Sequence, residues 1–158
     1  MEITIRTMEQ SDVQAITELL KEPGLFARIA SEAPSETRAH IARQLALCLS
    51  DDSHLLMVAE QAGGEVVGYI SVHWLPYLIH AGPEGYISEL FIRSNARGQG
   101  VGSRLLEKAE AEAVQRGCVR LALLNMRTRE SYQRKFYIKQ GWEQRSEAAN
   151  FVKVLQGK

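Results

Sequence analysis

Cysteine is scarce in this sequence: Cys48 and Cys118 are the only two in 158 residues, and they lie far apart. A small secreted protein held together by disulfides would carry more cysteines at closer spacing. We therefore expect two buried thiols in a reducing compartment. Metal-binding patterns are missing as well, because there is no CxxC pair and the four histidines are scattered. No metal cofactor is expected.

The sequence also lacks an excess of charge of either sign. Its 19 lysines and arginines balance 19 aspartates and glutamates, so the net charge is zero. Proteins that bind along a nucleic-acid backbone need a positive field. No nucleic-acid partner is therefore expected, although a net charge of zero does not exclude a local basic patch.

Long apolar runs are absent too. No run approaches the roughly 18 residues that suggest a membrane span. Residues 1–6 lack the basic start and the apolar core that mark a signal peptide. The sequence therefore predicts a cytoplasmic protein with no membrane partner.

What is present is the composition of an ordinary soluble globular protein. Hydrophobic residues make up 45% of the chain and charged residues 24%, and both shares are close to the averages for such proteins. The length of 158 residues suits one domain with a full hydrophobic core. We expect residues 1–158 to form that single domain.

The most informative stretch, residues 86–117, has the pattern of a strand, a glycine-rich turn and a helix. Residues 86–92 carry apolar side chains on both faces, which is typical of a strand buried on both sides. Apolar residues then recur at helical spacing from Val101 to Val114, and Gly117 is placed to end that helix. Three glycines occupy the turn: Gly98, Gly100 and Gly102.

These glycines suit a turn that binds an anion. The start of a helix presents unpaired N–H groups and partial positive charge, and glycine lets the backbone approach an anion closely. A tight turn that binds nothing explains the glycines equally well. Two familiar phosphate loops fit poorly. No Lys-Ser/Thr pair follows, as a P-loop requires, and no acidic residue stands about 20 positions later, as a dinucleotide-binding fingerprint requires.

A different signature fits better. The segment Arg97-x-x-Gly100-x-Gly102, directly after the apolar strand, resembles the acyl-CoA-binding signature of the GNAT superfamily of N-acyltransferases. A second segment, Phe136-Tyr137-Ile138-Lys139-Gln140-Gly141-Trp142, is similar to the Phe-Tyr-x-x-x-Gly-Phe segment of the same family. Two blocks in the family's order and at a typical separation are much more specific than either alone. The resemblance then extends in pattern over nearly the whole chain.

Periodicity and turn signals give the element order β-α-α-β-β-β-α-β-α-β-β. Leu25 to Pro34 shows no regular pattern, Thr128 to Gln140 reads as one helix, and Trp142–Arg145 with Phe151–Leu155 reads as a last strand pair. This order predicts an α/β fold, α+β in character, with a mixed sheet and helices on both faces. The resemblance implies the GNAT arrangement, a twisted central sheet of six to seven strands flanked by about four helices.

By the resemblance, the acyl donor is acetyl-CoA. Backbone groups of the central strand would pair with its pantetheine arm like an added strand. The glycine-rich turn would hold its pyrophosphate, where loop N–H groups and the helix dipole favour an anion. Arg97 would add positive charge there or remain a surface arginine. The residues implied in cofactor binding are Leu90, Phe91, Ile92, Arg97, Gly98, Gln99, Gly100, Val101, Gly102, Ser103 and Asn125.

Glu89 lies two residues before Phe91, on the same face of the central strand. A free alkylamine has a pKa near 10, so a base must remove its proton before it attacks a thioester. A carboxylate among apolar neighbours can have a raised pKa and act as that base, directly or through water. A structural salt bridge, or binding of a cationic substrate, would also explain Glu89. A main-chain N–H of this strand, at Phe91 or its neighbour, would stabilise the oxyanion.

Tyr137 lies where members of this family commonly have a tyrosine that protonates the departing thiolate, a group with a pKa near 8.5. Aromatic packing with a satisfied hydroxyl is the alternative, and it is the favoured interpretation for Tyr132. The chain departs from the family pattern nearby. Glu130 and Gln133 stand where asparagine and alanine are common, and the usual proline before Arg97 is missing.

The expected acceptor is a primary amine of a small molecule or a protein. The resemblance implies a cleft lined by the first two helices and the loop after the third strand. Surface aromatics packed on the core would explain the same residues. A homodimer is consistent with the resemblance, because family members often form one. The candidate acceptor residues are Phe26, His73, Trp74, Tyr77 and Glu84.

The sequence therefore predicts an N-acetyltransferase that moves an acetyl group from acetyl-CoA to a primary amine, by direct attack through a tetrahedral intermediate. One rival is a non-catalytic module of the same fold that senses acyl-CoA. Another is a nucleotide-binding regulator that uses the same glycine-rich turn.

Overall fold

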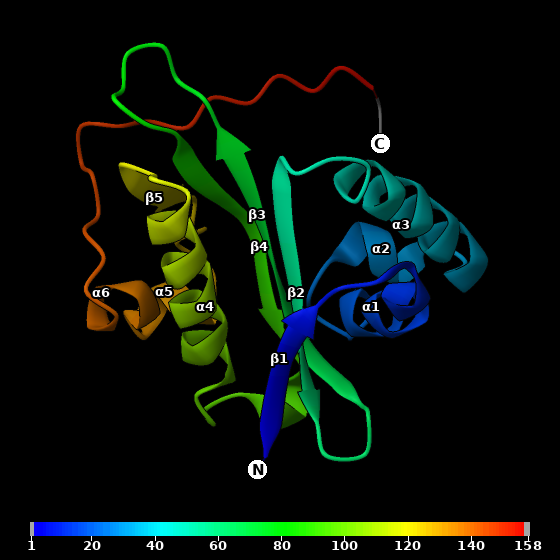
Figure 1. Ribbon diagram of the computed structural model, residues 1–158. Helices are drawn as coiled ribbons and strands as arrows, with labels where there is room; N and C mark the ends of the chain where they lie inside the picture. Colours follow the sequence, from blue (N-terminus) through cyan, green and yellow to red (C-terminus); the bar gives the residue numbers. More distant parts are fainter. Residues whose placement is uncertain (1, 157–158) are drawn as a thin grey trace. The chain divides into compact units, whose positions relative to one another are not determined.

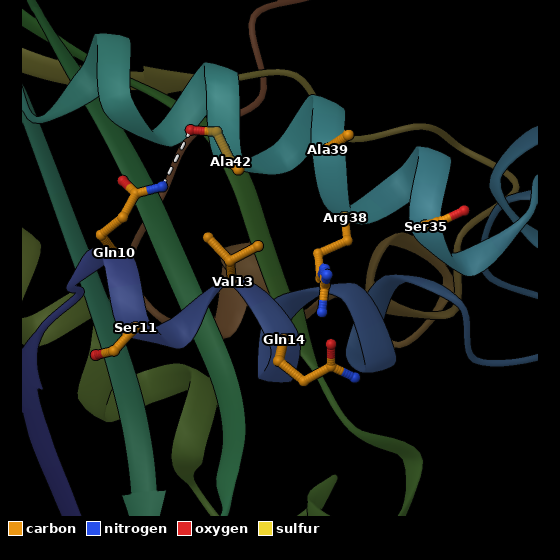
Figure 2. Close-up of a pocket in the computed structure, with 8 residues that line it drawn as sticks. All are labelled: Gln10, Ser11, Val13, Gln14, Ser35, Arg38, Ala39 and Ala42. Carbon is orange, nitrogen blue, oxygen red and sulfur yellow. Dashed lines mark hydrogen bonds between the residues drawn. The ribbon is translucent and has the colours of Figure 1, made fainter.

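The computed structural model describes residues 2–156, and their contacts divide them into two units. The first unit ends at Leu124 and the second begins at Asn125. Figure 1 traces the elements of both along the chain. The first unit holds the sheet and the long helices, and the second holds two short helices.

The first unit is built on one mixed sheet in which the strands lie side by side in chain order. The first four strands pair antiparallel with their neighbours, and the last pair is parallel. The mixed sheet predicted from the sequence is confirmed, with five strands in the described residues rather than six to seven. The strands are β1 (Ile3–Thr7), β2 (His54–Gln61), β3 (Val66–Leu75), β4 (Glu84–Ile92) and β5 (Arg120–Leu123).

Helices cover both faces of this sheet (Figure 1). One face carries α1 (Val13–Leu20), α2 (Ala27–Ser31) and α3 (Pro34–Cys48), and the other carries α4 (Val101–Gln115). The helix α2 falls where the sequence predicts no regular element, so that prediction was wrong. Five residues with a single buried side chain, Ile29, give too little periodicity to reveal a helix.

Strand alternation explains how the two faces are filled, because successive side chains of a strand point to opposite sides. Leu56 and Val58 of β2 and Tyr69 of β3 join the apolar sides of α1 and α3 in one buried cluster. The opposite face is packed against α4, whose buried side chains recur at the helical spacing seen in the sequence. These buried side chains are Val101, Leu105, Leu106, Ala109 and Ala113.

The second unit contains α5 (Glu130–Gln133) and α6 (Phe136–Lys139), where the sequence predicts one helix. The helix is interrupted because Lys135 adopts a left-handed conformation, with φ of 57°. Residue patterning cannot anticipate this, since lysine rarely occupies that region. The end of α6 matches the prediction. Gly141 has φ of 87°, and the N–H of Trp142 donates to the carbonyl of Tyr137 at 3.0 Å.

The expected last strand pair is a second correction. Neither Trp142–Arg145 nor Phe151–Leu155 forms a strand, and Phe151, Val152 and Leu155 are exposed. The apolar pattern of residues 151–155 favours an extended chain, but a strand also needs a partner for its backbone groups. Sequence periodicity carries no information about that partner.

An ion-pair network ties β1 to the start of α1. The short 3-10 helix η1 (Gln10–Asp12) ends in a carboxylate that is 7% exposed. Two nitrogens of Arg6 donate to Asp12 at 2.9 and 2.8 Å, and the backbone N–H of Glu9 donates to it at 2.8 Å. The Nε of Arg6 also donates to Glu60 of β2. These bonds hold the pKa of Asp12 below its ordinary value, with Arg6 as the main cause.

We expect Asp12→Asn to lower the free energy of unfolding by about 2 kcal/mol at pH 7, because hydrogen bonds to charged groups are worth roughly that much. Since the folded pKa lies below the unfolded one, the contribution of Asp12 is complete above about pH 4 and is lost as the pH falls further. Urea unfolding at pH 7 and pH 3 measures both effects. Asp52→Asn is the control, because Asp52 forms an exposed ion pair with Arg116. An equal loss in both variants would contradict this interpretation.

Candidate active site

The middle of β4 contains a bulge. In its pairing with β3, Glu89 lies opposite Ser71 but Ile87 lies opposite Val72, so Ser88 has no partner residue. Such an extra residue leaves backbone groups out of the ladder and re-aims the neighbouring side chains. The bulge therefore marks the place on the strand where backbone N–H groups and side chains are available to a ligand.

The other edge of β4 is open beside this bulge. β5 pairs only with Glu84 to Ile87. From Ser88 to Ile92, no strand of the described residues pairs with β4 on that side. An extended ligand with amide groups can add to such an edge as a strand does. The residues expected to face the pantetheine arm, Leu90, Phe91 and Ile92, lie along it.

The open edge leads into the glycine-rich turn. A short 3-10 helix, η2 (Ser94–Ala96), separates the two, and the Nε of Arg97 donates to the carbonyl of Ile92 at 3.1 Å. The Nε2 of Gln99 donates to the carbonyl of Asn95 at the same distance. Arg97 thus fastens the turn to the end of β4, and Gln99 fastens it to η2. Arg97 thus has a structural contact, whatever else its guanidinium binds.

The turn presents an uncovered helix start. Gly98 and Gly100 have φ of 72° and 79°, and a Cβ on either would meet no atom within 4 Å. The backbone shape, and not crowding, therefore requires glycine at both positions. Gly100 is the N-cap of α4, no side chain caps this helix, and its first turn holds no acidic residue. The helix start thus favours an anion. Val101, Gly102 and Ser103 form the first turn itself.

Glu89 lies on the sheet face that carries α1 to α3, together with Phe91 and Tyr69. The residue as a whole is exposed, yet burial around its carboxyl raises the pKa of that group, while the Tyr69 hydroxyl opposes the rise. No ion pair in the described part of the chain involves Glu89. A carboxylate of this kind is accessible to a ligand and is more basic than an ordinary glutamate.

His73 lies next to the bulge on the same face. Its Nε2 is 2.6 Å from the hydroxyl oxygen of Ser88, and its ring packs edge-to-face on His54 at 4.7 Å between centroids. Burial, with a smaller contribution from His54, lowers the pKa of His73. Phe26 also reaches this face, and its ring contacts Phe91 at 5.1 Å. Two expected acceptor residues thus lie on the same sheet face as Glu89.

The other expected acceptor residues lie elsewhere. Trp74 belongs to the opposite face and lies under the guanidinium of Arg116 at 4.9 Å. Glu84 is buried and pairs with Arg120 of β5, so its carboxylate has a structural role. Tyr77 is exposed in the β3–β4 loop, where its ring contacts His80.

Sequence reasoning did not identify Tyr69 or Ser88 as site residues. Cross-strand pairing and the bulge place them near Glu89, and neither feature leaves a pattern along the chain.

Tyr137 belongs to the second unit, on α6, where its ring contacts those of Phe136 and Trp142 at 5.0 and 5.9 Å. Burial raises the pKa of Tyr137 to about 12. The hydroxyl of Tyr132 donates to Gln144 at 3.1 Å, which agrees with a packing role. The Oδ1 of Asn125 accepts a hydrogen bond from Ser131. The second unit therefore supplies a protonated phenol whose ring is held by two aromatic neighbours.

The described residues contain no cluster of three His, Cys, Asp or Glu arranged to hold a metal ion. Among the same residues, no helix has the length and apolar character needed to cross a bilayer.

Comparison with known sequences identifies the same family that the sequence motifs resemble. A profile described as the acetyltransferase (GNAT) family matches residues 13–142. An aminoalkylphosphonate N-acetyltransferase of Salmonella typhimurium is 43% identical over 82 residues, which are 51% of this chain and 52% of that protein. A thialysine N-epsilon-acetyltransferase of Bos taurus is 33% identical over 72 residues, 44% of this chain and 42% of the relative. The match thus spans about half, or less, of the length of these relatives.

Solved structures share the fold over almost the whole chain. A transcriptional regulator from Bacillus halodurans has a TM-score of 0.84 and 26% identity, covering 98% of this chain and all of that one. Glucosamine-6-phosphate N-acetyltransferase from Arabidopsis thaliana has a TM-score of 0.76 at 22% identity, covering 99% and 100%. At that identity, the second likeness supports the fold alone.

Proposed function

Because this chain belongs to the acetyltransferase (GNAT) family, we propose that it moves an acetyl group from acetyl-CoA to a primary amine, by direct attack through a tetrahedral intermediate. One observation carries the proposal. The unpaired edge of β4, next to a bulge, continues into an uncapped helix start with two left-handed glycines. An extended amide chain that ends in a diphosphate has the shape and the charge to fit both parts.

The residues present fit acetyl-CoA, which supplies the thioester when it is bound. Backbone groups of Leu90, Phe91 and Ile92 would hold the pantetheine arm. The turn from Arg97 to Ser103 would hold the pyrophosphate through its N–H groups and the positive end of α4. Asn125 stays a proposed contact of the pantetheine arm.

Glu89 is the proposed base. The acceptor arrives mainly as an ammonium ion, because an alkylamine has a pKa near 10. The raised pKa of Glu89 makes its carboxylate a better proton acceptor at neutral pH than an exposed glutamate would be. A backbone N–H at the bulge or at Phe91 is the proposed donor to the oxyanion, since the bulge frees backbone groups from the β3 ladder.

The proposed acceptor is a small molecule with a primary amine. The names of the curated relatives support this class, since they describe acetyltransferases of an aminoalkylphosphonate and of thialysine. Phe26 and His73, beside Glu89, give the acceptor face one aromatic wall and one polar wall. A protein amine is the second candidate acceptor.

A non-catalytic sensor of acyl-CoA is the alternative function. The observation that favours it is the likeness to a protein described as a transcriptional regulator, at a TM-score of 0.84. A sensor needs the donor site but has no need of a base or an acid. Turnover separates the two proposals, because a sensor would bind acetyl-CoA and transfer nothing.

The test is isothermal titration of the full chain with acetyl-CoA, CoA and NAD, followed by a thiol-release assay with a panel of amines. We expect micromolar binding of acetyl-CoA and release of CoA with a small amine such as an aminoalkylphosphonate or thialysine. Binding without turnover across the panel would favour the sensor. Absence of binding to both CoA species, or preference for NAD, would overturn the proposed donor.

Replacement of Glu89, the proposed base, is expected to change both the reaction rate and the pH dependence of stability. We expect Glu89→Gln to lower kcat/KM about 100-fold, the usual contribution of a positioned base. The same variant should be more stable than the parent at pH 8. A carboxyl with a raised folded pKa contributes stability below its unfolded pKa and loses it as the pH rises through the folded pKa. Thiol-release kinetics and thermal unfolding at pH 5 and pH 8 measure both effects.

Glu107→Gln is the matched control, since Glu107 is exposed on α4. It removes the same charge and should change neither rate nor the pH dependence of stability. Full activity of Glu89→Gln would exclude Glu89 as the base and leave substrate binding as its role.

A further inference from the structure

Tyr69 is an unusual residue for the middle of β3. It is 2% exposed, and its hydroxyl is a buried oxygen without a hydrogen-bond partner in the described structure. Leaving a buried polar group unsatisfied destabilises the folded state. Phenylalanine would fill almost the same volume without that cost. The hydroxyl therefore needs an explanation other than packing.

The sheet register directs this hydroxyl toward the proposed base. Tyr69 lies directly opposite Phe91, and Glu89 lies two residues earlier on β4. Residues in this diagonal relation share a face, with Cβ atoms roughly 7–8 Å apart, which is within the reach of a tyrosine. The rings of Tyr69 and Phe91 are in contact at 5.9 Å, so the tyrosine side chain lies along the same strip as Glu89.

The two groups also affect each other's ionisation. Burial, and secondarily the charge of Glu89, raise the pKa of Tyr69, which therefore keeps its proton throughout the working pH range. In the opposite direction, the hydroxyl opposes the rise that burial causes in the pKa of Glu89. This reciprocal effect is what a phenol donating toward a carboxylate produces.

We propose that Tyr69 is a positioning residue for Glu89, whose hydroxyl donates a hydrogen bond to one carboxylate oxygen and leaves the other oxygen to take the proton of the acceptor amine. In the transfer, one N–H bond of the ammonium breaks and one O–H bond forms on Glu89. Tyr69 keeps its own proton. The inference rests on the proposed function, in which Glu89 is the base.

The other groups around Glu89 do not duplicate this role. Cys48, at the end of α3, interacts with Glu89, but burial and that carboxylate raise the pKa of its thiol, which stays neutral. The Nε2 of His73 lies within hydrogen-bond distance of the Ser88 hydroxyl. The ring of His54 packs on the ring of His73, and its Nδ1 lies within hydrogen-bond distance of the Ser53 hydroxyl. From α1, the buried polar side chain is Thr17, whose hydroxyl donates to the carbonyl of Val13. Among these groups, the Tyr69 hydroxyl is the donor that opposes the rise in the Glu89 pKa.

The test compares Tyr69→Phe with Tyr132→Phe, a tyrosine of the second unit whose hydroxyl already donates to Gln144. Side-chain carboxyl ¹³C NMR follows the titration of Glu89 in the full chain without any substrate. Loss of a hydrogen bond to the ionised form raises the pKa of the acceptor. We expect the Glu89 titration to move up by about one pH unit in Tyr69→Phe, since a charged hydrogen bond is worth roughly that shift. It should stay in place in Tyr132→Phe.

The kinetic profile is the second readout. The acidic limb of kcat/KM should move upward by the same amount in Tyr69→Phe, while a merely structural role would lower activity without moving the limb. An unshifted Glu89 titration in a folded Tyr69→Phe protein would overturn the inference.

A reciprocal measurement protects the test against a folding defect. In Glu89→Gln, removal of the carboxylate should lower the pKa of Tyr69, read by tyrosine ¹³C NMR. An unchanged Tyr69 titration would contradict the pairing. If both titrations shift but no amine is acetylated, the pairing stands and the proposed function fails, so the two outcomes are distinguishable.

Discussion

Gly100→Asp is expected to weaken binding of acetyl-CoA at least 100-fold, which corresponds to about 2.7 kcal/mol. Gly100 is the N-cap of α4, where the proposed diphosphate lies, and nothing surrounds its Cα to hide an added carboxylate. A second negative charge at 4–6 Å costs about 3–4 kcal/mol at an effective dielectric of about 20, and about 1 kcal/mol in bulk water. The carboxylate would also accept the N–H bonds of the first turn, as aspartate commonly does at this position. Both effects act against the same ligand group.

Two further variants separate charge from backbone strain. Gly100→Asn places a side chain of the same size at φ of 79° without the charge, and Asn tolerates the left-handed region about as well as Asp. It should retain most of the affinity. Gly64→Asp adds the charge at φ of 89° in the β2–β3 hairpin and should bind normally. Calorimetric titration with acetyl-CoA, together with thermal unfolding, measures all three. Equal losses in Gly100→Asp and Gly100→Asn would assign the effect to strain and leave the anion site unsupported.

Tyr137→Phe is expected to lower kcat about 10- to 100-fold, the loss that follows when a hydrogen bond to a developing charge is removed. The pKa of Tyr137, raised by burial to about 12, determines both its protonation state and its strength as an acid. It stays protonated from pH 6 to pH 10, so it is always available as a donor. It is also a weaker acid than a thiol with a pKa near 8.5, by about 3.5 units or about 5 kcal/mol. Complete transfer of its proton to the thiolate is therefore uphill, and hydrogen bonding to the leaving sulfur is the expected role.

The pH profile distinguishes this role from full proton transfer. Tyr137→Phe should lower kcat by a constant factor between pH 6 and pH 10, with little change in KM, because the lost hydrogen bond does not titrate in that range. Tyr132→Phe is the control from the same segment, since its hydroxyl already donates to Gln144. It should keep nearly the full rate. Thiol-release kinetics across the pH range measure both variants. Full turnover of Tyr137→Phe at every pH would show that the hydroxyl takes no part.

The central strand, turn and helix could be predicted from the sequence because local patterns determine them. Val101, Leu105 and Ala109 recur at helical spacing, and Gly100 is the residue that a left-handed N-cap requires. The shared face of Glu89 and Phe91 also follows from alternation alone. Their partners on β3 do not, because cross-strand register depends on where a bulge falls. No residue type in this stretch predicts the bulge at Ser88.

Other errors have separate physical origins. Trp74 and His73 are adjacent in sequence, and only the strand geometry places them on opposite faces. Glu84 resembled a site residue until Arg120, 36 positions later, proved to be its partner. The helix break at Lys135 reflects a backbone conformation that lysine does not favour, so propensity predicted the wrong outcome there. A long-range contact decided the case of Glu84, while strand alternation and a local backbone conformation decided the other two.

The half-paired β4 strand has a consequence for handling the protein. Unpaired N–H and C=O groups on a strand are a template for another chain, and natural proteins usually protect such edges. Here the backbone groups from Ser88 to Phe91 have no partner strand on that side, and the proposed ligand would use them. Ligand binding and self-association therefore compete for the same hydrogen-bonding groups. We expect the ligand-free protein to carry the greater risk of aggregation on storage, and a saturating donor to reduce that risk if it binds along this edge as proposed.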